Sequence, residues 1–248
     1  MSAQERQNNI GKLFQASIGN NTRDITSLLS QGVDPNATTF YRGDLPLHQA
    51  VWHNNIQAVK ILLEYNAYPN ITNDNGLSPF RIAVRWGYTD IVKLMLMPEF
   101  NTDINQVDQF SGNTLLHDAA INGHLDIFRL LIEHGFNIYS QTVEDIQVFF
   151  KEVCAHGQHQ IVKELFKLGL DPKMIMNCNI LMDPPLFAAA ENGFDKVIQV
   201  LINYGFNPNQ RTQLVCVTDT IGKLPVEVAI GEAKLLLENP GTGCGWVN

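Results

Sequence analysis

The residues best suited to chemistry in this chain are a cysteine and two nearby histidines, Cys154, His156 and His159. A thiol becomes a nucleophile when a neighbouring imidazole takes up its proton. However, residues two positions apart on one helix point in different directions, and no third group is evident that would orient the base. The chain is therefore predicted not to be an enzyme. A catalytic function hidden in the irregular segments 140–185 and 209–222 is the alternative left open.

The remaining histidines and cysteines do not predict a metal site. His53, His124 and His134 have no cysteine partners at the spacing of zinc ligands. The four cysteines, Cys154, Cys178, Cys216 and Cys244, show no paired spacing either, which favours free thiols in a reducing compartment. The sequence also lacks a phosphate-binding glycine loop and a carboxylate pair at a defined spacing. We therefore expect no cofactor.

Composition and charge exclude two further classes of function. The 248 residues have a net charge of −8, which argues against a nucleic-acid-binding protein because such a protein needs a basic surface to neutralise phosphates. No apolar run reaches membrane-spanning length, and the polar N-terminus MSAQERQNNI has no hydrophobic signal core. The sequence predicts a globular, cytoplasmic and monomeric protein that does not insert into membranes.

The elements that must position the side chains are most regular in residues 112–135, GNTLLHDAAINGHLDIFRLLIEHG. Thr114 is placed to cap a short helix that ends at Gly123, and a second helix over 125–134 ends at Gly135. The apolar residues of both helices recur at helical spacing. Two such short helices cannot bury their apolar faces against each other alone, so the pattern predicts neighbouring copies.

These copies recur along most of the chain. Equivalents of Gly123 lie at Asn20, Asn54, Gly87, Gly157 and Gly193, at steps of 34, 33, 36, 34 and 36 residues. A second motif recurs in register with them, as Leu45-Pro46-Leu47-His48-Gln49-Ala50, Ser78-Pro79-Phe80-Arg81-Ile82-Ala83 and Thr114-Leu115-Leu116-His117-Asp118-Ala119. On these residues the chain resembles the ankyrin repeat family, whose unit has about 33 residues and a T-P-L-H-x-A signature. The resemblance covers nearly the whole chain.

The resemblance implies an all-α repeat solenoid of six to seven helix-turn-helix units with β-hairpin-type turns and atypical capping repeats. The expected repeats are 10–36, 37–70, 71–105, 106–139, 140–173, 174–209 and 210–239, in a single domain between a polar tail or capping-helix start at 1–9 and a tail at 240–248. Repeat five lacks the signature, so its first helix is expected to start without the usual turn. Met174, Ile175 and Met176 in the connection that follows need burial. A truncated unit, 222–239, is expected to cap the array after a strand-like stretch at 214–218.

Family resemblance also assigns roles to individual polar residues. His48 and His117 are expected to form hydrogen bonds between neighbouring repeats. The asparagines at the hairpins are expected to hold them through side-chain hydrogen bonds, although in this family such asparagines can also be hydroxylated. These asparagines are Asn36, Asn70, Asn105 and Asn209.

Positions that the core does not need are the candidates for partner binding. According to the resemblance, the residues before each marker glycine and before each turn glycine face a concave surface. In repeats two to four these positions are rich in the aromatic and arginine residues that dominate interface hot spots. The candidate partner-binding residues are Tyr41, Arg42, Trp52, His53, Arg85, Trp86, Phe110 and Asn122. Our hypothesis is that a protein segment docks there, anchored by Trp52 and Trp86 with Arg85 between them. The alternative is that either tryptophan packs against its own repeat.

The sequence thus predicts a protein–protein interaction module whose partner it does not name. A targeting or scaffold module within a larger protein is the alternative. Asparagine makes up about a tenth of the residues, a composition associated with AT-rich genomes. Together with the repeats it suggests a bacterial effector that is delivered into a host cell and acts on a host protein.

Overall fold

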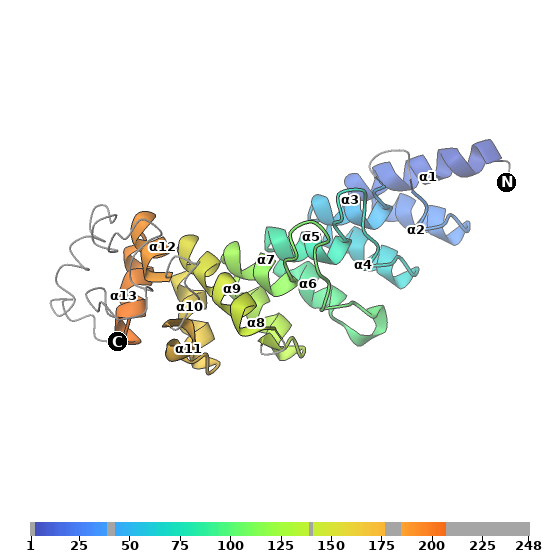
Figure 1. Ribbon diagram of the computed structural model, residues 1–248. Helices are drawn as coiled ribbons and strands as arrows, with labels where there is room; N and C mark the ends of the chain where they lie inside the picture. The colour runs from blue at the N-terminus through green and yellow to red at the C-terminus, as the bar shows by residue number, and fades with distance from the viewer. Residues whose placement is uncertain (1–2, 39–42, 139–140, 177–184, 207–248) are drawn as a thin grey trace. The chain divides into compact units, whose positions relative to one another are not determined.

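The computed structural model describes residues 3–38, 43–138, 141–176 and 185–206, and in these ranges the protein is built from helices (Figure 1). Six antiparallel helix pairs follow one another along the described chain, one for each of the first six expected repeats. The first pair is α1 (Ala3–Ile18) with α2 (Thr22–Ser30), and the others are α3 (Pro46–Trp52) with α4 (Ile56–Glu64), α5 (Pro79–Trp86) with α6 (Thr89–Met95), α7 (Leu115–Ile121) with α8 (Leu125–Glu133), α9 (Val143–Ala155) with α10 (His159–Lys167), and α12 (Pro185–Glu191) with α13 (Asp195–Asn203).

Two short elements complete the described helices. The 3₁₀ helix η1 (Pro98–Phe100) follows α6, and α11 (Pro172–Met176) follows α10. In the described ranges, the hairpin-type turns contain one isolated antiparallel bridge, between Val107 and Thr114. The all-α repeat class expected from the sequence is therefore confirmed. The expected seventh unit and the stretch at 214–218 lie outside the described residues.

Local sequence explains where the short helices begin and end. Ser78 caps α5 by accepting the Arg81 N–H, and Pro79 at the first helical position has no N–H that would lack a partner. The first helices end at residues with positive φ, as at Asn54 (φ 53) and Gly157 (φ 75). At Gly157 the need for glycine is twofold, because a Cβ there would lie 2.7 Å from the Phe194 ring of the next repeat.

The contacts divide the chain into two compact units. The first contains 1–119 and 126–136, and the second contains 120–125 and 137–248. In the first unit, the core consists of apolar side chains that the helical periodicity predicted, among them Leu13, Ile25, Leu47, Val59 and Phe80. These residues are at most 1% exposed, so each helix pair buries its apolar face against its neighbours in the unit.

The second unit has an aromatic cluster in its core. Phe150 of α9 lies 5.3 Å from Phe166 of α10 between ring centroids, and Phe166 stacks on Tyr204 at 4.1 Å. Phe206 lies 6.5 Å from Phe150, again between centroids. The cluster joins the second helices of repeats five and six to α9.

Repeat five differs from the others as expected, and the structure gives the reason. Its first helix, α9, spans 13 residues, whereas the first helices of repeats two to four span seven or eight. Thr142 and Asp145 cap it reciprocally, because Thr142 Oγ1 accepts the Asp145 N–H and Asp145 accepts the Thr142 N–H. Of the three apolar residues after α10 that were expected to need burial, Ile175 of α11 is fully buried, whereas Met174 and Met176 are half-buried. Gln147 donates to the Met174 carbonyl at 2.7 Å.

Most of the N-terminal residues 1–9, expected as a polar tail or as the start of a capping helix, are helical. Helix α1 begins at Ala3, so most of the residues expected as a tail at 1–9 belong to a helix of 16 residues. The capping-helix alternative therefore describes them better.

Candidate partner-binding surface

Two tryptophans from successive repeats meet at the ends of α3 and α5. The ring centroids of Trp52 and Trp86 lie 5.9 Å apart, and the ring planes are tilted by 56°. Trp86 is 54% exposed, and Trp52 is partly exposed beside it. The contact covers only part of each indole ring, so a large aromatic surface faces solvent in the first unit.

Arg85 does not lie between the indoles as hypothesised. The two rings contact each other, and Arg85 Nε lies 3.4 Å from Oδ1 of Asp118 in α7. The Arg85 side chain is 36% exposed, whereas Asp118 is fully buried. The carboxylate of the next repeat therefore holds the half-exposed guanidinium of the residue that directly precedes Trp86.

A second, buried arginine shares this carboxylate. Arg81 Nε lies 2.7 Å from Asp118 Oδ2 and 3.6 Å from Asp108 Oδ2, and Arg81 Nη2 donates to the Asn113 carbonyl at 2.6 Å. Arg81 is 1% exposed and stands where other repeats have the signature histidine. The ionic cluster thus joins repeat three to repeat four beneath the exposed residues.

The two carboxylates of this cluster respond to their surroundings in opposite ways. Burial raises the pKa of Asp118 above its ordinary value, although the charges of Arg81 and Arg85 oppose the shift. Burial also acts to raise the pKa of Asp108, but N–H groups of Ser111 and Phe110 and the Arg81 charge outweigh it. The pKa of Asp108 therefore lies below its ordinary value.

Phe110 occupies the tip of the turn in repeat four. Asp108 Oδ1 accepts the N–H groups of Phe110 and Ser111, both at 2.9 Å, which fixes the turn. The Phe110 side chain is 78% exposed, and one edge of its ring lies against Gly76 in the turn of repeat three. This large, exposed aromatic residue is held in place by its backbone.

The structure shows fewer contacts for the other candidate residues that it describes, and two candidates lie outside the described residues. His53 is exposed after α3, with Nδ1 2.9 Å from the Gln49 carbonyl oxygen. Asn122 is exposed after α7 and belongs to the second unit. Tyr41 and Arg42 lie outside the described residues. In the described first unit, the structure thus brings Trp52 and Trp86 together, and it brings Arg85 to Asp118, which Arg81 also contacts.

The cysteine and histidines that first suggested chemistry are not arranged for nucleophilic attack. Cys154 is fully buried, and burial raises the pKa of its thiol well above the ordinary value. His156 follows α9 with Nδ1 2.8 Å from the Glu152 carbonyl oxygen, and His159 begins α10. Over the ranges that the structure describes, no three histidine, cysteine or acidic side chains are grouped to hold a metal ion.

The structural roles expected for His48, Asn36 and Asn70 are confirmed, whereas Asn209 lies outside the described residues. His48 Nδ1 accepts the Leu45 N–H at 3.0 Å, and its Nε2 lies 2.9 Å from the Leu77 carbonyl oxygen of the next repeat. Asn36 donates to the Asn66 carbonyl at 2.9 Å and accepts the Tyr68 N–H at 2.8 Å. Asn70 makes the same pair of bonds one repeat later, to the backbone of 101 and 103.

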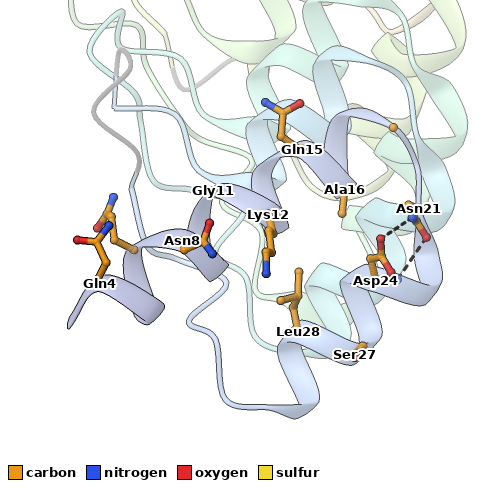
Figure 2. Close-up of a pocket in the computed structure, with 12 residues that line it drawn as sticks. Gln4, Asn8, Gly11, Lys12, Gln15, Ala16, Asn21, Asp24, Ser27 and Leu28 are labelled. Carbon is orange, nitrogen blue, oxygen red and sulfur yellow. Dashed lines mark hydrogen bonds between the residues drawn. The ribbon is translucent and has the colours of Figure 1, made fainter. Parts of the chain in front are cut away.

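A groove of about 1010 Å³, lined mostly by residues with polar side chains, lies between α1 and α2 (Figure 2). Its lining is rich in amides and includes Gln4, Asn8, Gln15 and Asn21. Asn21 caps α2 by accepting the Asp24 N–H and also donates to the Asp24 carboxylate at 2.7 Å. A polar outer face of this kind is typical of the capping repeat of an array.

The described chain consists of helix pairs whose first helices end at residues with positive φ, and hydrogen bonds join one repeat to the next. These features define a helical repeat protein of the helix-turn-helix type. The chain belongs to the ankyrin repeat family, because the sequence model of ankyrin repeats, in three copies, matches residues 13–108 and 70–142. Ankyrin repeats are protein–protein interaction modules, and the fold is generally non-enzymatic. None of the helices in the described part of the chain combines the length and apolar character that a membrane crossing requires.

Similar proteins come from varied organisms. A putative ankyrin repeat protein of Fowlpox virus, FPV240, is 36% identical over 108 residues, which are 44% of this chain and 25% of that protein. The E3 ubiquitin-protein ligase XBAT33 of Arabidopsis thaliana is 34% identical over 38% of this chain and 18% of its own length. The crystal structure of the human ASB11 ankyrin repeat domain covers 93% of this chain and 99% of its own, with a TM-score of 0.70 and 25% identity. The chain thus spans a quarter or less of the two full-length relatives.

The sequence did not identify the ionic cluster of Arg81, Asp108 and Asp118. One signal was available, because Arg81 replaces a signature histidine that is buried in the neighbouring repeat. A buried arginine requires a buried anion, and Asp118 lies in the signature of the next repeat. Sequence alone does not give the 2.7 Å distance between them.

Proposed function

We propose that the chain binds a segment of a partner protein through the surface formed by Trp52, Trp86 and Arg85 in its first unit. Phe110 and His53 are the described residues that extend this surface; Tyr41, Arg42 and Asn122 remain candidates by their positions in the repeat. The observation that carries the proposal is the exposed tryptophan pair, with Trp86 54% exposed and its centroid 5.9 Å from that of Trp52.

Physical arguments support a protein partner. Tryptophan and arginine are the residues most enriched in interface hot spots, where a few side chains dominate the binding energy. The pair is held by contact between its own rings, and Arg85 is held by the buried Asp118. Side chains held in place before binding lose less conformational freedom when a partner docks, and that lowers the cost of association.

The test compares two double variants of the full chain. Trp52→Ala with Trp86→Ala removes the proposed anchors. Tyr65→Ala with Tyr68→Ala is the matched control, since it removes two exposed aromatic side chains of the same unit from positions outside the surface. Both variants are first compared with the parent chain by circular dichroism and thermal unfolding.

Each chain is then used for affinity purification from candidate cells, with quantitative mass spectrometry. A true partner is retained by the parent and by the tyrosine variant and is lost from the tryptophan variant. Retention of every stoichiometric partner by a folded tryptophan variant would reject the surface.

A targeting or scaffold module in a longer protein is the second candidate function. It is supported by the lengths of the relatives, since the matched segment is 25% of the Fowlpox virus protein and 18% of XBAT33. In that case the partner binds equally to this chain and to a longer protein that contains it. The two functions share the binding surface and differ in what else is brought to the partner.

A cytoplasmic effector role in a host cell is a narrower form of the same proposal. It is supported by the asparagine content of about a tenth and by the presence of a viral protein among the relatives. Identification of a host protein as the partner in the affinity purification would support it, and a partner from the source organism would contradict it.

A further inference from the structure

Three asparagines in the chain directly precede a glycine: Asn75, Asn122 and Asn192. In such a pair the glycine nitrogen can attack the side-chain carbonyl carbon of asparagine, because glycine has no side chain to obstruct the approach. A bond forms between that nitrogen and Cγ, the bond from Cγ to the side-chain nitrogen breaks, and ammonia leaves. Water then opens the cyclic succinimide to aspartate or isoaspartate. The reaction needs water alone and involves no oxidation.

Two of these pairs lie at helix ends. Asn122 and Asn192 follow α7 and α12, and the next glycine N–H in each case donates to the carbonyl three residues earlier, Ala120 or Ala190, at 3.1 Å. The Asn192 side chain is held by a bond from Nδ2 to the Ala188 carbonyl at 2.8 Å. Ring closure there requires these bonds to break and the helix end to open.

The segment around Asn122 is also covered by the next repeat. Gln158 donates to the Ile121 carbonyl at 3.1 Å, and its side chain occupies the space where a Cβ on Gly123 would lie. All of these residues belong to the second unit. Attack by the Gly123 nitrogen therefore requires movement of two packed repeats as well as the helix end.

Asn75 lies instead at the tip of an exposed turn in repeat three. The bonds of this turn converge on the buried Asn73, whose carbonyl accepts the Gly76 N–H at 2.9 Å and whose Oδ1 accepts the Asn75 N–H at 3.0 Å. Asn75 itself is exposed. Opening this two-residue tip breaks its contact with the Phe110 ring, which is itself 78% exposed, and unwinds no helix. It therefore requires less free energy than opening a helix end against a neighbouring repeat.

We propose that Asn75 is a site of spontaneous deamidation in the folded protein, and that Asn122 and Asn192 are protected. The product places a carboxylate next to the exposed Asp74 and directly before Gly76. Isoaspartate also lengthens the backbone by one methylene in the turn on which the Phe110 ring rests. If the proposed function holds, the reaction changes one edge of the partner-binding surface irreversibly with time.

The experiment follows all three asparagines in the full chain without a partner, so its outcome is independent of the proposed function. The folded chain and a chain unfolded in urea are incubated in mildly alkaline buffer and digested, and each peptide is examined for the mass gain of replacing –NH₂ by –OH. Isoaspartate is measured separately by enzymatic methylation with a labelled methyl donor. Asn75→Gln is the control, because its longer side chain closes the ring much more slowly.

In the folded chain, we expect Asn75 to react about tenfold faster than Asn122 or Asn192, since a local opening of lower free energy is more often populated. The three rates should converge in urea, and Asn75→Gln should abolish most of the methylation of the folded chain. Equal rates at the three sites in the folded chain, faster reaction at Asn122 or Asn192, or undiminished methylation of the Asn75→Gln chain would overturn the proposal.

Discussion

Replacing Arg81 by methionine should destabilise the first unit strongly, because it removes a 2.7 Å ionic contact from a fully buried carboxylate. The change removes the 2.7 Å contact to Asp118, the 3.6 Å contact to Asp108 and the bond to the Asn113 carbonyl. Breaking a buried ion pair by removing one member costs 3–5 kcal/mol in general. Arg85 still contacts Asp118 Oδ1 at 3.4 Å, so we expect about 3 kcal/mol, the lower end of that range.

The prediction is sharpest as a double-mutant cycle. Asp118→Asn alone leaves Arg81 with the more distant Asp108 and should also cost about 3 kcal/mol. In the double variant the charges of Arg81 and Asp118 are both absent, so its loss should be smaller than the sum of the two by about 2 kcal/mol.

Urea unfolding followed by tryptophan fluorescence measures these free energies in the relevant unit. Trp52 and Trp86 both lie in the first unit, and Trp246→Phe removes the third tryptophan from the signal in every chain. This choice matters because neighbouring parts of a repeat protein can unfold separately. Strict additivity of the two single changes, or a loss below about 1 kcal/mol for Arg81→Met, would refute the assigned role of the cluster.

Three further predictions concern packing, pH and thiol reactivity. Gly157→Ala should lower the free energy of unfolding in urea by about 2–4 kcal/mol, because the added Cβ strains the backbone at φ 75 and clashes with Phe194. Gly205→Ala, at φ 91 with open space around it, should lower that free energy by about 1 kcal/mol, and equal losses would contradict the packing argument. Burial lowers the pKa of His48, so on acidification the histidine of the unfolded chain is protonated before that of the folded chain, and stability that is present above pH 6.5, the ordinary histidine pKa, should fall as the pH drops. His48→Asn should flatten part of this dependence of stability on pH, and an unchanged dependence would exclude His48 as its source. Because Cys154 is buried and the pKa of its thiol is raised, it should react with iodoacetamide far more slowly in the folded chain than in the chain unfolded by urea. Rapid labelling of Cys154 in the folded chain would reopen the question of a nucleophile.

The sequence predicted the helices well because their information is local and repeated. Glycine or asparagine at regular steps marks the helix ends, and both Asn54 and Gly157 adopt the positive φ that such ends require. The same residue types at helical spacing predicted the buried faces, since a short helix is stabilised mainly by burying its apolar side. The early start of α9 was not predicted, although Thr142 and Asp145 have the spacing of a capping box.

The candidate surface was only partly predictable, because its geometry depends on contacts between repeats. Exposure of Trp86 and Phe110 followed from their positions, but the 5.9 Å contact between Trp52 and Trp86 depends on how two repeats pack. The partner of Arg85 was missed for the same reason, since Asp118 is more than 30 residues away in sequence. Positions in a repeat predict which side chains are available, and tertiary contacts decide how they are held.

The most direct test of the account is the affinity of a purified partner for the parent chain and for the Trp52→Ala, Trp86→Ala double variant, measured by isothermal titration calorimetry. The account predicts that the double variant remains folded and binds more weakly by about 2–4 kcal/mol, while the Tyr65→Ala, Tyr68→Ala control binds like the parent chain. Equal affinity of the tryptophan variant and the parent chain would contradict the central claim that the exposed indole pair anchors the partner.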